Sequence, residues 1–545
     1  MLPMGGRMQD WPLTVDRLLD GAAQWHGATE IVTRYPDGSV FRSSYADLAL
    51  RARLVSQALR KAGVGQGDVI ATLASNSLDH LAVWYGVMGI GAVCHTLNPR
   101  LHDDQLAYIA NHAGDRWLFA DGMLVAQAGR IAARAPGIGT IVTINDPRSG
   151  GFGEYPHLDE FIVGGDGADC AWGGFDERLT AGLCYTSGTT GDPKGVAYTH
   201  RSNTLHAMNT MAPDAFALSA RDVIMPVVPM YHANTWGLAF SGPAVGAKLV
   251  MPGPQLDGGS LHALIEAEGV TFAAGVPTVW QGYVDHLRER GIARTSMQRV
   301  VVGGSACPAA LIAALEALGT TVIHAWGMTE LSPVGLVATP TRSVLALSTD
   351  EQREQALKQG RPIGIDARIV DESGRALSRD GSAVGHLEVR GPGVIERYVG
   401  HAHSALSDDG WFDTGDIASI DRHGYVRITD RAKDIIKSGG EWISSVDVEN
   451  ALLTHPDVAL AAVIGIAHDK WGERPKLYVQ LRPSLDEGDG RDLAQVFRDY
   501  LAARIARWWV PDEVEIIGTI PIGATGKIDK KALRALHEAG SQPAY

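Results

Sequence analysis

The spacing of apolar residues alternates between two periods over the first two thirds of the chain. Residues 45–63, YADLALRARLVSQALRKAG, place apolar side chains every three or four positions, which predicts an amphipathic helix. The short apolar runs 69–74, VIATLA, and 249–253, LVMPG, have glycine or proline close by, which predicts strands. Helices and strands in alternation predict an α/β fold with mostly parallel sheets.

From about residue 414 the pattern changes to paired short strands. DIASID and YVRITD surround the turn DRHG at 421–424, which predicts a β-hairpin. Ser444 or Ser445 can then cap a helix, and two further apolar runs at 458–466 and 476–482 predict strands. We therefore divide the chain into a large N-terminal domain, 1–429, and a small C-terminal α+β domain, 430–545.

Size and charge narrow the class of protein. The 545 residues exceed what one hydrophobic core usually serves, which agrees with two domains. The net charge of −14 gives no reason to expect nucleic acid or an anionic membrane as a partner. The four cysteines form no CxxC pair, which argues against a zinc cluster or a disulfide frame and fits a cytoplasmic protein.

No integral membrane segment is expected. The longest apolar run, LAVWYGVMGIGAV at 81–93, is shorter than the roughly 20 residues of a membrane helix. We interpret it as a buried helix followed by a turn and a strand. The N-terminus lacks the uninterrupted apolar stretch of a signal peptide.

The loop YTSGTTGDPKGV, 185–196, has a composition suited to phosphate. Its glycines let backbone N–H groups approach an anion, its hydroxyls donate hydrogen bonds, and its lysine supplies charge. The expected phosphate contacts are Thr186, Ser187, Gly188, Thr189, Thr190, Gly191 and Lys194. The loop does not match the phosphate loop of kinases and GTPases, because Pro193 precedes the lysine and Gly195 follows it. From composition alone, a flexible surface loop is the alternative.

Five segments in order resemble the motifs of the adenylate-forming acyl-CoA synthetases. They are YTSGTTGDPKGV at 185–196, HAWGMTE at 324–330, WFDTGD at 411–416, DRAKDIIKSGGEWIS at 430–444 and GATGKIDK at 523–530. The resemblance implies a large N-terminal domain of parallel and mixed sheets flanked by helices, with a small mobile C-terminal domain. It also implies two steps: a carboxylic acid reacts with ATP to give an acyl-adenylate and pyrophosphate, and coenzyme A then displaces AMP.

The resemblance assigns the chemistry of the first step to a few side chains. Lys527 is the catalytic lysine, Glu330 holds Mg²⁺ and Thr329 donates to the α-phosphate. Trp326, where most relatives have tyrosine, stacks on adenine, while Asp416 and Arg431 contact ribose or phosphate. The other implied nucleotide and coenzyme A contacts are Gly304, Ser305, Ala306, Ala325, Gly327, Met328, Ile428, Gly439, Gly440 and Trp442. Taken singly, these residues could be a solvated lysine, helix caps, a core tryptophan and a hairpin ion pair.

Lys433 occupies the hinge position of the family. The resemblance implies that the C-terminal domain rotates there between the two steps, which withdraws the catalytic lysine and presents another face to coenzyme A. Homodimers occur in the fatty acyl-CoA synthetase branch, so a homodimer is possible.

The segment VVPMYHANTWG, 227–237, resembles the wall of the acyl pocket. His232 would lie near the carboxylate, Trp236 would gate the pocket, and Val276, Gly304 and Trp326 would complete it. The segment has no acidic residue to pair with an amine, which favours an apolar acid. A medium-chain fatty acid fits the pattern, 3-methylmercaptopropionate and aryl acids such as cinnamate are alternatives, and an ADP-forming ATPase is the alternative outside this class.

Overall fold

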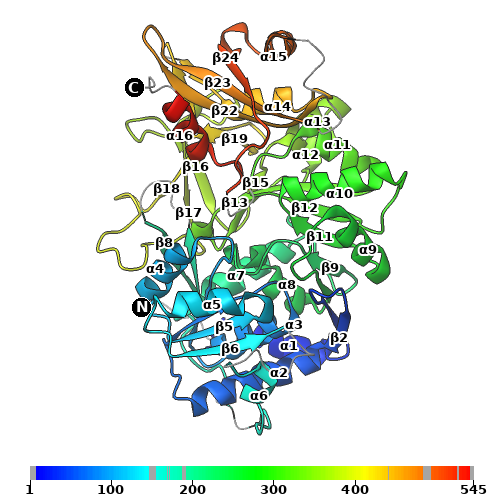
Figure 1. Ribbon diagram of the computed structural model, residues 1–545, viewed down its shortest axis with the longest axis vertical. Coiled ribbons are helices and arrows are strands. Elements are labelled where there is room, and N and C mark those ends of the chain that lie inside the picture. Colours follow the sequence, from blue (N-terminus) through cyan, green and yellow to red (C-terminus); the bar gives the residue numbers. More distant parts are fainter. Residues whose placement is uncertain are drawn as a thin grey trace, which may run out of the picture.

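The structure is a computed structural model of the chain (Figure 1). It describes residues 8–145, 155–168, 170, 172–186, 192–439, 441–482, 492–523 and 527–540. Six predicted contacts lie outside these ranges: Ser187, Gly188, Thr189, Thr190, Gly191 and Gly440. Within the described residues, the strands form sheets of six, nine, four and five strands.

The six-stranded sheet carries the phosphate loop at one edge. Its strands, in spatial order, are β6 (Thr140–Ile144), β5 (Trp117–Asp121), β3 (Val69–Leu73), β4 (Val93–Thr96), β7 (Thr180–Thr186) and β8 (Lys194–Thr199). All neighbours are parallel except β7 and β8, which pair antiparallel with Thr186 opposite Lys194. The two ends of the phosphate loop are therefore held next to each other.

The nine-stranded sheet is parallel in its centre. Its order is β15 (Arg361–Pro362), β14 (Val334–Val337), β13 (Thr321–Gly327), β12 (Arg299–Val302), β11 (Phe272–Gly275), β9 (Val223–Pro226), β10 (Lys248–Met251), β1 (Glu30–Arg34) and β2 (Val40–Ser44). The strands from β13 to β1 run parallel, and both edges are antiparallel. The α/β prediction is confirmed.

Helices cover both faces of the two large sheets. Between the sheets lie α1 (Asp16–His26), α2 (Tyr45–Lys61), α3 (Leu78–Met88), α7 (His200–Met211) and α8 (Leu238–Val245). On the outer faces lie α4 (Asp103–Ala113), α5 (Val125–Ala132), α9 (Gly258–Glu268), α10 (Pro277–Glu289) and α11 (Ala309–Ala317). Ile70 faces the inner core and Ala71 the outer one, as the two-residue period of a strand requires. Parallel strands need this cover on both faces.

The predicted changes of secondary structure along the chain occur close to the expected residues. The helix predicted over 45–63 is α2, which begins after a capping box formed by Ser44 and Asp47. The run 81–93 spans the end of the fully buried α3, a turn and the start of β4. The predicted hairpin joins β18 (Phe412–Ile420) and β19 (Val426–Arg431), which complete an antiparallel sheet with β16 (Asp366–Val370) and β17 (Val384–Arg390).

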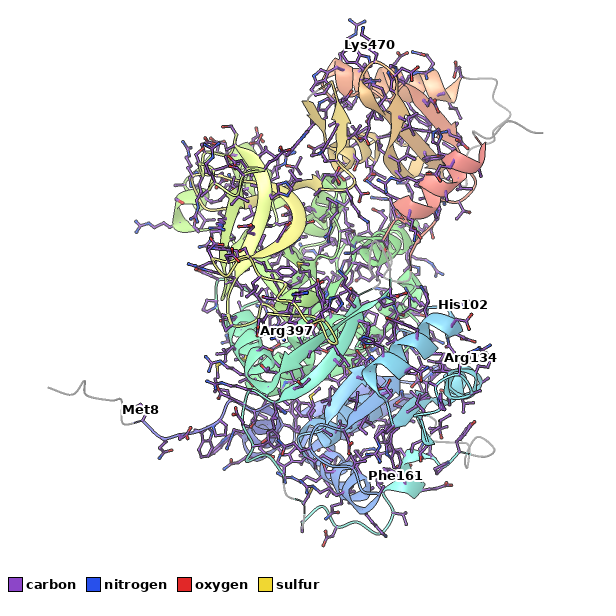
Figure 2. The ribbon with its side chains drawn as sticks, turned by 90° about the vertical axis from the view of Figure 1, so that its left-hand side faces the viewer. Met8, His102, Arg134, Phe161, Arg397 and Lys470 are labelled. Carbon is purple, nitrogen blue, oxygen red and sulfur yellow. The ribbon has the colours of Figure 1, made fainter. Side chains whose placement is uncertain are left out.

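The C-terminal segment forms a separate α+β layer at one end of the molecule (Figures 1 and 2). It contains β20 (Ile436–Ser438), β21 (Glu441–Ile443), α14 (Ser445–Leu452), β22 (Val458–His468), β23 (Gly472–Leu481), α15 (Leu493–Ala502), β24 (Glu513–Ile516) and α16 (Lys530–Gly540). Ser444 caps α14 by accepting from the Asp447 N–H, as expected. The chain leaves β19 at Arg431 and enters β20 at Ile436, so the connection between the layers is short.

Several short helices complete the described structure. They are α6 (Leu158–Phe161), α12 (Arg342–Leu345), α13 (Thr349–Leu357), and the 3₁₀ turns η1 (Gly122–Leu124), η2 (Ala233–Gly237), η3 (Thr329–Leu331) and η4 (Arg507–Trp509). Turn η2 comes after β9, and η3 comes after β13. Residues of both turns line the same cavity.

Candidate active site

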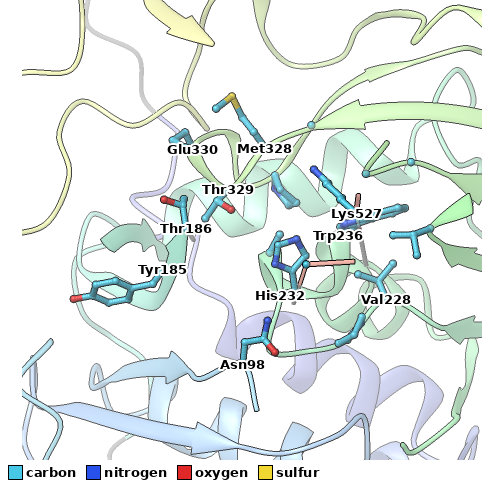
Figure 3. Close-up of a pocket in the computed structure, with 18 of the residues that line it drawn as sticks. Asn98, Tyr185, Thr186, Val228, His232, Trp236, Met328, Thr329, Glu330 and Lys527 are labelled. Atoms are coloured by element: carbon cyan, nitrogen blue, oxygen red, sulfur yellow. The ribbon is translucent and has the colours of Figure 1, made fainter. Parts of the chain in front are cut away.

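A cavity of about 930 Å³ lies at the carboxyl ends of the parallel strands. Open α/β sheets bind ligands in such crevices, because the loops that follow the strands converge there. Fifteen of the predicted site residues line it: Thr186, Lys194, His232, Trp236, Val276, Gly304, Ala325, Trp326, Gly327, Met328, Thr329, Glu330, Arg431, Lys433 and Lys527. They come from both large sheets, the hairpin and the C-terminal layer, and Figure 3 shows part of this set.

The charge of this lining is opposite to that of the whole chain. Seven Lys and Arg side chains line the cavity against four Asp and Glu, although the chain carries −14 overall. The cations are Arg100, Lys194, Arg431, Lys433, Lys527, Lys530 and Lys531. A local excess of positive charge of this kind attracts and retains polyanions such as nucleotides.

Lys527 reaches the centre of the cavity from the C-terminal layer. The Gly523 N–H donates to the Lys527 carbonyl at 2.7 Å, which fixes the backbone at Lys527. Burial and then Arg431 lower the pKa of the Lys527 ammonium to about 8, against the opposing effect of Asp416 and Glu330. The lysine is therefore charged at neutral pH, but more weakly than an exposed lysine.

His232 lies beside this lysine (Figure 3). Burial, with a further contribution from Lys527, lowers the pKa of His232 to about 4, so the imidazole is neutral at physiological pH. A neutral imidazole can accept or donate one hydrogen bond without adding charge next to a substrate carboxylate.

Asp416 does not itself line the cavity but lies behind Trp326 and Arg431, which do. Its side chain is 2% exposed, and Trp326 Nε1 donates to Oδ2 at 2.9 Å while Arg431 Nε lies 2.8 Å from Oδ1. Burial raises the pKa of Asp416, and Arg431 opposes that rise. The indole N–H of Trp326 therefore helps to fix the orientation of this carboxylate.

Glu330 and Lys194 are joined through a residue that motif reasoning missed. Tyr398 Oη donates to Glu330 Oε1 at 2.8 Å, and Lys194 Nζ lies 5.0 Å from the centroid of the Tyr398 ring. Tyr398 lies in none of the five motifs. The one available signal is that it is the only Phe, Tyr or Trp between residues 391 and 410.

The acyl side of the cavity is shaped by backbone constraints. Ala233, Asn234, Thr235 and Trp236 all have φ between 45° and 57°, a left-handed run that L-residues rarely adopt. The run places Trp236, 7% exposed, against Gly303 and Gly304: a Cβ added to Gly303 would lie 3.2 Å from the indole ring. A Cβ at 303 would also lie 2.7 Å from the Ala325 carbonyl, so this close approach requires glycine.

Asn76 fixes the adjoining wall and was also missed. Its side chain donates to the carbonyls of Pro226 at 2.8 Å and Val228 at 2.9 Å, and accepts from the Met230 N–H at 2.7 Å. The residue is 3% exposed and lies just after β3 of the other large sheet. It therefore ties the two sheets together next to the predicted acyl wall.

Some predicted contacts lie away from this cavity. Ala306, Ile428 and Trp442 line a second cavity of about 950 Å³ between the large sheets and the C-terminal layer, together with His324. Ser305 is exposed, and Gly439 packs against Trp471. The roles given to these five residues stay predictions.

Lys433 lies in the short connection between β19 and β20. Burial lowers the pKa of Lys433. Two ion pairs fasten α16: Arg534 Nη2 lies 2.7 Å from Oδ1 of Asp434, in the connection, and Lys530 Nζ lies 2.7 Å from Oε1 of Glu449, in α14. These pairs hold α16 against α14 and the C-terminal end of the connection.

In the ranges that the structure describes, no helix is long and apolar enough to cross a membrane. No group of three or more His, Cys, Asp and Glu side chains in those ranges could hold a metal ion by itself.

Comparison with known proteins identifies the family. The model of the AMP-binding enzyme matches residues 19–399, and the model of the AMP-binding enzyme C-terminal domain matches residues 447–527. A 3-methylmercaptopropionyl-CoA ligase of Ruegeria lacuscaerulensis is 44% identical over 97% of this chain and 98% of its own. A medium-chain-fatty-acid–CoA ligase of Ectopseudomonas oleovorans is 44% identical, with 97% of both chains covered.

Solved structures agree on the fold. The anthranilate CoA ligase AuaEII in complex with anthranoyl-AMP superposes with a TM-score of 0.85, at 24% identity, over 98% of this chain and 100% of that chain. The predicted fold and the predicted resemblance are confirmed, and the ADP-forming alternative is set aside. The chain belongs to the AMP-binding enzyme family and is an AMP-forming acid–CoA ligase that uses ATP and coenzyme A.

Proposed function

We propose that the acid is apolar and uncharged beyond its carboxylate, and that it is a medium-chain fatty acid. The observation that carries this proposal is the composition of the acyl wall, which contains Val227, Val228, Val276, Val279 and Leu256. The carboxylates of the cavity, Glu330, Asp413, Asp434 and Asp529, all belong to other segments. A substrate amine would have no partner at this wall, and an unpaired charge is costly to bury.

The names of the relatives support an aliphatic acid. One relative is named for a medium-chain fatty acid and another for 3-methylmercaptopropionate. Both acids are unbranched chains that present apolar surface next to a carboxylate. 3-Methylmercaptopropionate is the first alternative and an aryl acid the second.

In the first step, Lys527 bridges the acid and the α-phosphate. As the acid carboxylate attacks phosphorus, negative charge moves from the carboxylate to the phosphate oxygens and the leaving pyrophosphate. A compact ammonium on a flexible stem stabilises both positions, and stabilisation of developing charge is usually the largest contribution to catalysis. Neutral His232 next to it orients the acid without competing for the lysine.

The phosphates lie toward Thr186, Lys194 and Thr329, whose hydroxyl and ammonium groups are donors. Glu330 fits Mg²⁺, because this ion prefers oxygen ligands and is usually held by one or two carboxylates together with substrate phosphates. When bound, Mg²⁺ would neutralise charge on the phosphates that leave as pyrophosphate. The donors predicted at 187–191 would add further hydrogen bonds to the phosphates.

Asp416 receives the ribose. Each of its oxygens accepts one bond from the protein and keeps a second lone pair, so ribose hydroxyls can donate to a carboxylate whose orientation is already fixed. The Trp326 ring offers its face to adenine.

In the second step, the C-terminal layer rotates about Lys433. Rotation would withdraw Lys527 and bring Gly439, Gly440 and Trp442 toward coenzyme A. Because the connection from 432 to 435 is short, few backbone angles need to change, as is usual for hinges.

The acid is identified by a panel that runs from acetate to palmitate and includes benzoate and 3-methylmercaptopropionate, with AMP and ADP both quantified. Each buried methylene contributes about 0.8 kcal/mol, so kcat/KM should rise about fourfold per carbon until the pocket is full. We expect the maximum at a medium-chain acid, with AMP as the nucleotide product. A maximum at benzoate or acetate would overturn the proposed acid.

We further propose a cytoplasmic location and a homodimer. Cys94, Cys184 and Cys307 are buried free thiols, which supports a reducing compartment. β2 is the edge strand of the nine-stranded sheet, and its Val40 and Phe41 are 45% and 43% exposed, which supports pairing with a second copy. Light scattering after size-exclusion chromatography measures the mass, and a monomer at micromolar concentration would exclude the dimer.

A further inference from the structure

The segment from Ile395 to Val399 is fastened on two sides to the phosphate end of the cavity. The Ile395 N–H donates to the Glu330 carbonyl at 3.0 Å, and the Val399 N–H donates to the Gly195 carbonyl at 2.9 Å. Figure 2 labels the neighbouring Arg397 at this part of the molecule. Tyr398, between these two bonds, is thus held between η3 and the start of β8.

The Tyr398 side chain contacts both charged groups at this end of the cavity. Its hydroxyl donates to Glu330 Oε1 at 2.8 Å, and its ring faces Lys194 Nζ at 5.0 Å from the centroid, within the range of a cation–π contact. Burial and Glu330 raise the pKa of Tyr398, so the phenol stays protonated and remains a donor.

This geometry keeps two opposite charges apart. Lys194 and Glu330 form no ion pair with each other, although both line the same cavity and both contact Tyr398. In the described structure Tyr398 is the group that donates to Oε1, while Oε2 receives no hydrogen bond. A direct pair would occupy the lysine needed by phosphate and the carboxylate needed by a divalent cation.

We propose that Tyr398 is a positioning residue for the reaction with ATP: its hydroxyl orients Glu330 toward Mg²⁺, and its ring holds Lys194 toward the phosphates. The inference rests on the proposed role of Glu330 in holding Mg²⁺. Tyr398 touches neither the reacting carboxylate nor the phosphorus, and it acts through two side chains that are set before the substrate enters.

The test separates the hydroxyl from the ring. Tyr398→Phe removes only the hydroxyl. We expect the Mg²⁺ concentration for half-maximal ATP–pyrophosphate exchange to rise about tenfold, since a hydrogen bond to a charged group is lost. The KM for the acid and the rate of thioester formation from supplied acyl-adenylate should change less than twofold.

Equilibrium binding gives a readout that does not depend on turnover. Calorimetry of ATP binding with and without Mg²⁺ measures how much the ion strengthens binding. In Tyr398→Phe this enhancement should fall about tenfold, with metal-free ATP affinity unchanged. Tyr398→Leu, which also removes the ring, should weaken metal-free binding as well, because Lys194 loses its contact.

A matched control and a double variant exclude a general loss of structure. Tyr425 Oη donates to the Thr339 carbonyl elsewhere in the same domain, so Tyr425→Phe loses a comparable bond and should leave the Mg²⁺ dependence unchanged. If Tyr398 acts through Glu330, Tyr398→Phe combined with Glu330→Gln should be no worse than Glu330→Gln alone.

The outcomes distinguish two failures. If Glu330→Gln leaves the Mg²⁺ dependence unchanged, the metal role of Glu330 is wrong and the orienting role of Tyr398 falls with it. If Glu330→Gln shifts the dependence but Tyr398→Phe does not, or if the two effects simply add, only the inference about Tyr398 is overturned.

Discussion

The nucleotide side and the acyl side of the cavity are built in different ways. On the nucleotide side, charged groups are oriented by specific partners: Trp326 and Arg431 hold Asp416, and Tyr398 holds Glu330. On the acyl side, apolar side chains are placed by backbone constraints, namely the left-handed run before Gly237 and the close approach of Trp236 to Gly303.

This difference indicates how the two sides can vary. A carboxylate or ammonium at the nucleotide side has few tolerated replacements, because its partners are left buried and unpaired when it changes. An apolar wall tolerates changes of volume at moderate cost. Substitutions should therefore alter the chemistry and the acid preference separately.

The largest effect is expected for Lys527→Ala. Adenylate formation should fall a thousandfold or more, at the upper end of the range for loss of a group that stabilises developing charge. Thioester formation from supplied acyl-adenylate should survive, because the lysine is withdrawn in that step. The two half-reactions are assayed separately, and equal loss in both would refute the assignment.

Asp416→Asn should have the next largest effect. The amide leaves Arg431 without its anionic partner and turns one acceptor into a donor, so kcat/KM for ATP should fall about 30-fold, or roughly 2 kcal/mol. The KM for the acid should change less than twofold. A matching rise in the KM for the acid would show that the two sides are coupled.

Lys433→Pro should act on the movement between the steps. Proline fixes φ near −65° and removes an N–H, so rotation at this position is restricted. Thioester formation should fall about tenfold more than adenylate formation, measured by single-turnover assays of each half-reaction. No difference between the two half-reactions would contradict a hinge at this residue.

The pH dependence of adenylate formation should report Lys527. Burial lowers its pKa to about 8, and the ammonium is the active form, so activity is complete below this value and is lost as pH rises through it. ATP–pyrophosphate exchange at pH 9 should be about tenfold below its plateau. The rate of thioester formation from supplied acyl-adenylate, measured over the same pH range, should not fall by half near pH 8.

Trp236→Ala should have the smallest effect and only on the acyl side. Removing the indole enlarges the pocket, so the preferred acid should lengthen by several carbons and kcat/KM for the best wild-type acid should fall about fivefold. The KM for ATP should stay within twofold. Gly303→Ala is not an equivalent variant, because its Cβ would meet the backbone carbonyl of Ala325 at 2.7 Å and disturb the chain next to Trp326.

Much of the fold and the centre of the site can be predicted from the sequence. Helix α2 and strand β3 follow directly from apolar spacing and caps, because these signals are local. Lys527 and Thr186 are 341 positions apart in the sequence, yet both line the same cavity. This proximity could be predicted only because the segments that contain them resemble motifs of one family, in the same order.

The supporting contacts could not be predicted. The bond from Trp326 to Asp416 joins residues 90 positions apart, and Asn76 reaches Pro226 across 150 positions. Neither pair has a local periodicity, and Tyr398 and Asn76 lie outside all five motifs. Such contacts depend on how the sheets pack against each other, and the apolar pattern of a single strand does not determine that packing. Ala306, Ile428 and Trp442 line the second cavity, and their predicted contacts with the nucleotide and coenzyme A stay predictions.

The positive lining of the cavity within an acidic protein has a consequence for capture of substrate. At a distance, the −14 chain repels ATP, coenzyme A and the acid alike, and attraction begins only near the opening. At physiological ionic strength the Debye length is about 8 Å, which confines the repulsion to the surface and still allows the lining to act on a molecule that has entered. Salt added above physiological ionic strength should therefore change the entry rate of these anions little. In a very dilute buffer the repulsion reaches further, and the entry rate should fall.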